Sequence, residues 1–256
     1  LAAAFNDMTR ELDIQFKVLM ASANMDQAIL SISDIEQIVM TGLKLFKTLY
    51  GSQPIVISLL ESSQPVQGRS FVHINGKATQ EHMTIPFHLS PEEYRIFDND
   101  QNWLRLEAGP DAPHHLFTLQ QPGVSGYYIF PIRHRRHLFA IVSIGAGKQK
   151  EFDQVELERI RGFCDHLAVA FANSNLVQEL KDLNLGTLYA LARTVDAKSP
   201  WTAGHSVRGT LMAIRIAAAM GLDLSSQEKL RSAGLLHDIG KIGIPLSILD
   251  KKGKLT

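Results

Sequence analysis

Hydrophobic positions along the chain recur with two periodicities, one of three to four residues and one of two residues. The periodicity of three to four residues predicts helices at 7–23 and 35–49. Ser33 and Glu36 form a capping-box pattern at the start of the second helix. A short helix is expected from Ser90-Pro91-Glu-Glu93, with proline in its first turn. Apolar β-branched or alternating runs predict strands, which cover 54–60, 69–74, 127–132 and 138–144. The last two form a hairpin around a polar turn.

A much longer helical pattern opens at Asp153 and Glu156 and continues to about Val195. If unbroken from residue 152, this helix would be about 66 Å long, at about 1.5 Å per residue. Gly186 is its expected weak point, because glycine costs about 1 kcal/mol in a helix interior. Two helices, strands in the middle and a long exit helix predict an α+β fold, with a central antiparallel sheet and flanking helices.

Composition excludes several classes of protein. The chain has 256 residues, enough for one to two domains, with 26 Lys and Arg against 26 Asp and Glu. Zero net charge argues against a histone-like nucleic-acid binder. Cys164 is the single cysteine, so no intramolecular disulfide can form, which fits a reducing cytoplasm. We find no apolar run long enough for a membrane span and no signal peptide. Because Leu1 stands first, an excerpt of a longer chain is expected.

The first half of the chain and the segment that follows it resemble a GAF domain, the small-ligand sensor module of signalling proteins. The resemblance covers 31–172 and rests on the predicted hairpin together with Phe152-Asp-Gln-Val-Glu156 and Leu167-Ala-Val-Ala-Phe-Ala-Asn173. It implies an unidentified small ligand held against the sheet and flanking helices that pair in a homodimer. The motif by which some GAF domains bind cyclic nucleotides is not found. Cys164 lies within a helix and is interpreted as a small buried side chain, not as a tetrapyrrole attachment site.

Eight of the ten histidines lie in this sensor-like region. His114 with His115, and His134 with His137, could bind a metal, but neither pair has a cysteine or carboxylate at ligand spacing. We therefore interpret both pairs as exposed loop histidines. The basic turn at 133–137 is interpreted in the same way, as a hairpin loop without a nucleic-acid partner.

The remaining two histidines belong to a predicted helical hairpin. Its first helix runs from His205 to Gly221 with Thr202 as the candidate N-cap, and its second runs to His237 from a capping box of Ser225 and Glu228. The two helices would measure about 24 Å and about 18 Å. Because the connection between them is short, they should run antiparallel.

The hairpin should bring His205 to the same end as His237 and Asp238. Two imidazoles and one carboxylate suit iron, zinc, manganese or nickel, and a carboxylate can also bridge two ions. A two-metal site activates water and stabilises both oxygens of an in-line phosphoryl displacement. Lys241 follows Asp238 by three residues, and its ammonium could hold a phosphate.

The string Leu235-Leu-His-Asp-Ile-Gly-Lys-Ile-Gly-Ile-Pro245, with Gly204-His-Ser206 upstream, resembles the HD-GYP subgroup of HD-domain phosphohydrolases. Further matches stand at 196–198, 201–206, 233–236 and 248–256. The resemblance covers 185–256 and implies an all-α domain. Members hydrolyse the bacterial messenger cyclic di-GMP through a metal-activated water, using two or three metal ions, often iron.

The resemblance assigns roles to four residues of this sequence. His205, His237 and Asp238 fall on metal ligands, with Asp238 the bridging carboxylate, and Lys241 falls on the lysine that contacts the scissile phosphate. Trp201 stands where three-metal members have a glutamate, which favours two ions, iron ahead of manganese. The remaining family ligands and the Gly-Tyr-Pro motif do not occur in residues 1–256. We therefore expect this segment to be the N-terminal portion of the domain and inactive alone.

The two resemblances together imply a bacterial signalling phosphodiesterase regulated by a GAF sensor, and the composition fits a cytoplasmic protein. Its expected segments are an N-terminal helix (1–30), the sensor (31–172), a connecting helix (173–184) and the phosphohydrolase segment (185–256). Two alternatives stay open: a catalytically silent sensor and dimerisation regulator, and an HD phosphohydrolase acting on another nucleotide.

The connecting helix also carries a candidate dimer seam. Leu176, Leu180 and Leu183 are spaced by four and then three residues, as in a paired-helix seam. The alternative is that they pack on the start of the catalytic helices or on the N-terminal helix.

Overall fold

The computed structural model describes residues 34–51, 53–61, 64–73, 83–110, 112–134, 137–147, 151–198 and 203–253. The predicted helix at 7–23, which belongs to the expected N-terminal segment (residues 1–30), lies outside these residues. The chain divides into two compact units, with the boundary between Asn175 and Leu176.

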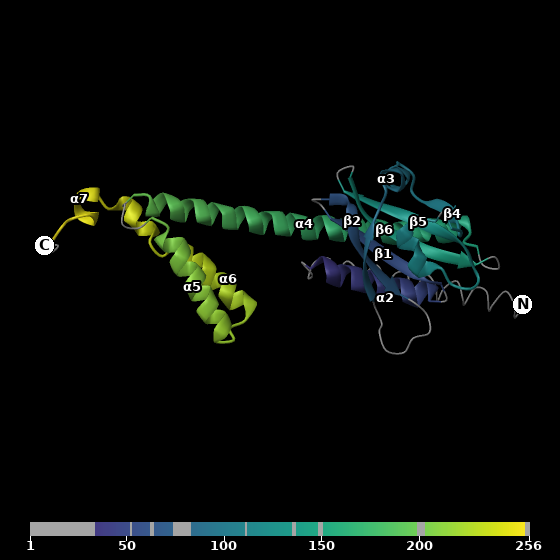
Figure 1. Cartoon of the computed structure of the whole chain (residues 1–256), viewed down its shortest axis with the longest axis horizontal. Helices are drawn as coiled ribbons and strands as arrows, with labels where there is room; N and C mark the ends of the chain where they lie inside the picture. Colours follow the sequence, from purple (N-terminus) through teal and green to yellow (C-terminus); the bar gives the residue numbers. More distant parts are fainter. Residues whose placement is uncertain are drawn as a thin grey trace, which may run out of the picture. The chain divides into compact units, whose positions relative to one another are not determined.

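A six-stranded antiparallel sheet forms the centre of the first unit (Figure 1). Its strands are β1 (Ile55–Glu61), β2 (Gln64–His73), β3 (Met83–His88), β4 (Leu104–Glu107), β5 (Val124–His134) and β6 (His137–Gly147). They lie in the order β3-β2-β1-β6-β5-β4, and β1 pairs with both β2 and β6. The predicted α+β fold with a central antiparallel sheet is confirmed, including the β5–β6 hairpin.

Strand β3 was not predicted from the sequence. Its residues alternate in polarity, but Pro86 stands in its middle and argues against a strand, since proline has no N–H to donate to a neighbour. The structure accommodates Pro86 because β3 is an edge strand, paired on one side only with β2. The opposite edge is β4, which has only four residues.

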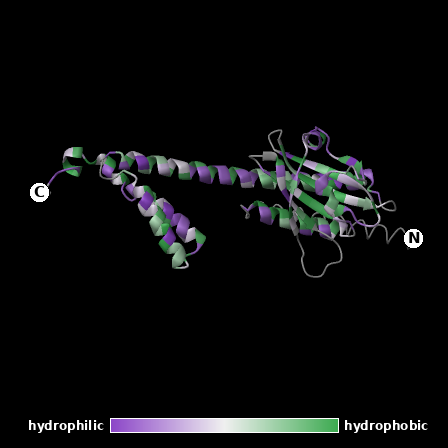
Figure 2. Ribbon diagram, in the orientation of Figure 1, coloured by the Kyte–Doolittle hydropathy of each residue, from purple (hydrophilic) through white to green (hydrophobic). Residues whose placement is uncertain are grey.

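The two faces of the sheet are covered differently. Helix α2 (Ile35–Tyr50) and the beginning of α4 (Gln154–Asp196) pack on one face through Phe46, Phe163 and Leu167. The buried Cys164 belongs to this layer. The short helix α3 (Pro91–Phe97) and the 3-10 helix η1 (His114–Leu119) contribute to the core on the other face. Figure 2 shows the strands between these layers as mainly hydrophobic, which matches their double-sided burial.

Side-chain caps are present at the start of three helices of the first unit. At α3, where the sequence predicted a short helix, the Ser90 hydroxyl and the Glu93 carboxylate form a reciprocal capping box, and Asp153 with Glu156 forms another at the start of α4. The prediction of a box at Ser33 for α2 was wrong. Asp34 is the N-cap, and its carboxylate accepts a hydrogen bond from the Glu36 backbone N–H.

Helix α4 has 43 residues and continues through Gly186, so the glycine does not interrupt it. A cost of about 1 kcal/mol is small beside the propensity of flanking leucines and alanines for the helix. The side chains of residues 176–184 are all exposed, and Figure 2 shows this middle section as mainly hydrophilic. Among the described helices, none is both long enough and apolar enough to span a membrane.

The second unit is helical, as predicted. It contains the end of α4, then α5 (His205–Ala219), α6 (Leu224–Leu236), the 3-10 helix η2 (Ile239–Gly243) and α7 (Leu246–Leu249). The predicted Ser225 capping box was wrong: Asp223 is the N-cap of α6 and accepts from the Ser226 N–H. The prediction of Thr202 as the cap of α5 was also wrong, because Gly204 occupies the N-cap position.

Candidate metal centre

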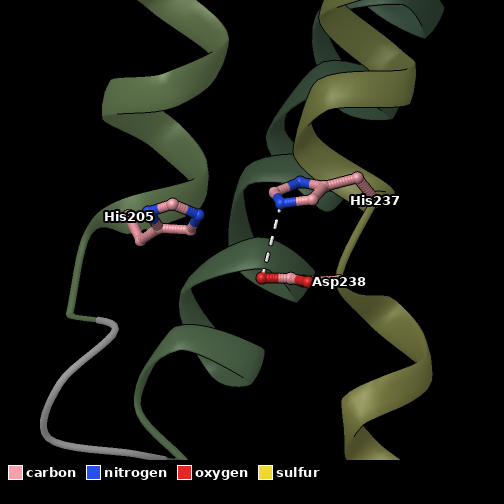
Figure 3. A group of neighbouring side chains, drawn as sticks. All are labelled: His205, His237 and Asp238. Atoms are coloured by element: carbon pink, nitrogen blue, oxygen red, sulfur yellow. Dashed lines mark ion pairs between the residues drawn. The ribbon is translucent and has the colours of Figure 1, made fainter.

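Three side chains converge where α5 begins and α6 ends (Figure 3). His205 is the first residue of α5, and His237 with Asp238 directly follows α6. One potential ligand atom from each lies within 4.8 Å of the others, and the two imidazole centroids are 5.7 Å apart. The juxtaposition expected from the two helix lengths is therefore present.

Close packing of the two helices sets this arrangement. Gly234 of α6 lies against Thr210 of α5, and a Cβ atom on Gly234 would come within 2.6 Å of the Thr210 hydroxyl oxygen. A side chain at Gly234 would therefore push the helices apart one turn before His237. The same glycine provides the carbonyl that orients the His237 ring.

The His237 ring is held in the tautomer that a metal ligand needs. Its Nδ1 lies 2.8 Å from the Gly234 carbonyl oxygen, which can only accept, so Nδ1 carries the proton. In the neutral ring Nε2 is then the atom with the free lone pair, and it lies 3.4 Å from Oδ2 of Asp238. A backbone carbonyl on the second nitrogen is the usual way in which a protein orients a metal-binding imidazole.

Asp238 is held as a carboxylate. The Lys241 ammonium donates a hydrogen bond of 2.6 Å to Oδ2, and this bond is the main reason that the pKa of Asp238 lies below its ordinary value. The neighbouring imidazoles lower the pKa further when charged, while partial burial opposes the shift. The Lys241 ammonium therefore contacts Asp238 directly and is part of the site.

The donor set fits a divalent ion of the first transition row. Two imidazoles and one carboxylate are ligands for iron, manganese or zinc, and both imidazoles are exposed to solvent. Across the described parts of the chain, this is the one group of three or more such side chains with metal-binding proximity.

The other histidines did not assemble into a second such group among the described residues. The prediction that His114 and His115 are both exposed was half wrong. His114 is exposed, but His115 is only 2% exposed and packs against the rings of Phe87 and Phe97. The side chains of His134 and His137 lie outside the described set.

His115 lines a cavity of about 430 Å³ in the first unit. The lining residues come from β2, β3, α3 and η1 and the segments beside them: Ser70, Ile85, Pro86, Phe87, His88, Ser90, Glu93, His114, His115 and Thr118. Neither ring nitrogen of His115 has a hydrogen-bond partner among the described residues. Burial lowers the pKa of His115 to about 3, so the ring is neutral at ordinary pH.

Comparison with known families agrees with both units. The GAF domain family matches residues 34–171, more than half of the chain, and the HD domain family matches residues 202–256. The chain belongs to the GAF domain family. Its GAF domain is followed by an HD segment that contains the candidate metal centre. A phycoerythrobilin-bound GAF domain from a cyanobacterial phytochrome has 15% identity and a TM-score of 0.48, covering 64% of this chain and 99% of that chain.

Curated relatives with sequence similarity are phosphodiesterases of cyclic dinucleotides. The 3'3'-cGAMP-specific phosphodiesterase 2 of Vibrio cholerae is 31% identical over 128 residues, which cover 50% of this chain and 24% of the relative. The 3'3'-cGAMP-specific phosphodiesterase 3 of the same organism is 50% identical over 66 residues, 26% of this chain and 14% of the relative. A cyclic di-GMP phosphodiesterase response regulator of Xanthomonas campestris is 35% identical over 80 residues, 31% of this chain and 21% of the relative. The matches thus span about a quarter or less of each relative's length.

Proposed function

We propose that this chain is the sensor and the start of the catalytic domain of a metal-dependent phosphodiesterase that hydrolyses a guanine-containing cyclic dinucleotide. The observation that carries the proposal is the convergence of His205, His237 and Asp238, with Nε2 of His237 free for a ligand bond. The relatives' names support the substrate class, and include both cyclic di-GMP and 3'3'-cGAMP.

The four predicted residues have distinct roles in this proposal. His205, His237 and Asp238 would hold a divalent metal, iron or manganese, and two ions are expected in the full-length protein. Such ions supply an activated water and charge stabilisation for a phosphoryl displacement. Lys241 places a positive charge beside Asp238, where it attracts a phosphate oxygen of the bound dinucleotide.

Turnover by the protein at its full natural length tests the proposal. Purified protein loaded with Fe²⁺ or Mn²⁺ is incubated with cyclic di-GMP, 3'3'-cGAMP and cyclic di-AMP, and products are separated by chromatography. We expect linear dinucleotide or mononucleotide from the guanine-containing substrates. Turnover of neither, with metal bound, would favour the silent regulator, and turnover of an unrelated nucleotide alone would favour a general HD phosphohydrolase.

We also propose that the cavity beside His115 holds the small regulatory ligand of the GAF domain. A buried polar group without a partner costs about 1–3 kcal/mol, and a ligand that hydrogen-bonds to it removes this cost. The walls combine apolar side chains of β3 with the neutral His115 imidazole and with polar residues such as Glu93 and Thr118. This chemistry favours a small ligand that has both an apolar part and hydrogen-bonding groups.

We further propose that the protein is a homodimer paired through the middle of α4. Leu176, Leu180 and Leu183 are 39%, 65% and 68% exposed, at the spacing of a helix seam. Residues 1–256 are expected to have the mass of a dimer in light scattering. Leu176→Glu with Leu180→Glu should shift the population to monomer, because buried like charges oppose pairing. Leu224→Glu, at an exposed leucine of α6 outside the seam, is the control. A wild-type monomer at high micromolar concentration would contradict the seam.

A further inference from the structure

A three-residue segment at the end of α4 contacts both stretches of backbone that carry the candidate metal centre. Asp196 is the last residue of α4, and Lys198 follows two residues later. Asp196 bonds to the start of α5, and Lys198 bonds to the turn that follows Asp238. Both residues belong to the stretch 196–198 that resembles the HD-GYP subgroup, and the resemblance gave neither a role.

Asp196 acts as the N-cap of a helix to which it does not belong. Its carboxylate is 2% exposed and accepts two hydrogen bonds from Ser206, from the backbone N–H at 3.1 Å and from the hydroxyl at 2.7 Å. Gly204, at the N-cap position itself, has no side chain to satisfy these amides and adopts a φ of +71°, where glycine is favoured. Asp196 therefore supplies the missing acceptor and fixes the backbone directly after His205.

Lys198 holds the turn on the other side of the centre. Its ammonium donates to three backbone carbonyls, those of Lys241 (2.9 Å), Ile242 (2.6 Å) and Ile244 (2.6 Å). An ammonium has three N–H donors, so all of them are used. The carbonyls lie at the C-terminal end of η2, where helical backbone carries partial negative charge. The position of Lys241, which lies on this turn, therefore depends on Lys198.

We infer that Asp196 and Lys198 are positioning residues with separable tasks: Asp196 sets the position of the metal ligand His205, and Lys198 sets the position of Lys241 toward the substrate phosphate. The inference rests on the proposed function of the centre. Neither side chain is itself a member of the ligand group. Loss of Asp196 should therefore weaken metal binding, whereas loss of Lys198 should weaken catalysis with metal still bound.

The test compares Asp196→Asn and Lys198→Met in the protein at its full natural length, with Mn²⁺ as the metal. Asp196→Asn keeps the shape of the side chain but places an amide against the Ser206 donors. We expect its affinity for Mn²⁺, measured by titration and elemental analysis, to fall about 10-fold, within the range seen when the outer support of a metal ligand is lost, because the backbone directly after His205 loses its bonds to Asp196. Saturating Mn²⁺ should restore most of its turnover.

Lys198→Met should behave differently. It should retain wild-type Mn²⁺ content while kcat falls about 10-fold or more, since the lost interaction acts on the phosphate in the transition state. Added Mn²⁺ should not rescue it. Lys252→Met, at an exposed lysine near the end of the described chain, is the matched control for loss of charge and should equal the wild type. Ser206→Ala removes one of the two bonds to Asp196 and should have an intermediate metal affinity.

Two outcomes would overturn the inference. Wild-type metal content and kcat in both variants would show that neither residue positions the site. Parallel loss of metal, kcat and melting temperature in both would show a general effect on folding. A wild-type protein that binds no Mn²⁺ and hydrolyses no cyclic dinucleotide would instead contradict the proposed function.

Discussion

Asp238→Ala in the protein at its full natural length is expected to abolish hydrolysis of cyclic dinucleotides and to remove bound metal. Asp238 is the one carboxylate of the ligand group. Its Oδ2 atom accepts a hydrogen bond from Lys241 and lies 3.4 Å from Nε2 of His237. Metal ions contribute several kcal/mol to a phosphoryl transition state, so turnover should fall by about 10³-fold or more. Elemental analysis and product chromatography on the same preparation give both measurements.

Two comparisons make this result specific. Lys241→Ala should lower turnover while leaving metal content unchanged, because an ammonium is not a metal ligand. Asp182→Ala removes a carboxylate from the exposed section of α4 and should change neither quantity. Near-normal turnover of Asp238→Ala would contradict the assignment of the centre, whatever the behaviour of Lys241→Ala.

His115→Phe is expected to change how the stability of the GAF domain depends on pH. Burial lowers the pKa of His115 to about 3 in the folded protein, whereas an unfolded histidine has a pKa of about 6.5. As the pH falls below about 6.5, the unfolded chain takes up a proton that the folded chain excludes, so His115 makes folding less stable by about 1.4 kcal/mol per pH unit. The free energy of unfolding of His115→Phe relative to wild type should therefore be about 2 kcal/mol higher at pH 5 than at pH 8.

Guanidinium titrations followed by Trp103 fluorescence measure this difference. Trp103 packs against the core of the GAF domain, and a Trp201→Phe background leaves it as the single tryptophan. Any change in packing caused by the new ring affects both pH values and cancels in the comparison. If the free energies of unfolding of His115→Phe and wild type changed equally with pH, His115 would have the same pKa in the folded and unfolded protein, which would contradict the prediction.

Local signals in the sequence were sufficient for most of the fold. The β5–β6 hairpin, β1, α3 and the helical hairpin all have strong periodicity or a capping pattern within a few residues. Gly186 was predicted as a weak point from local propensity, but a single glycine costs less than the remaining turns of α4 contribute. Strand β3 was missed because Pro86 is acceptable only at an edge, and edge position is a property of the whole sheet.

In the candidate centre, too, some residues could be placed from the sequence and others could not. His205, His237 and Asp238 could be brought together from helix lengths and one short connection. The roles of Asp196 and Lys198 could not, because their bonds span 10 and more than 40 residues and end largely on backbone atoms, which have no sequence signature. Gly204 was the available signal: a helix start without a capping side chain needs an acceptor from elsewhere. His115 was misjudged because a 3-10 helix buries it beside Leu116 while its neighbour His114 stays exposed.

The edges of the GAF sheet restrict how two copies of the protein can associate. Unpaired strand edges are templates for polymerisation, in which the sheet of one molecule continues into that of the next. Here one edge is interrupted by Pro86, which offers no N–H, and the other is only four residues long. Neither provides the continuous row of donors and acceptors that an added strand needs. Raising the local concentration of this protein should therefore not drive the growth of fibres through its sheet edges.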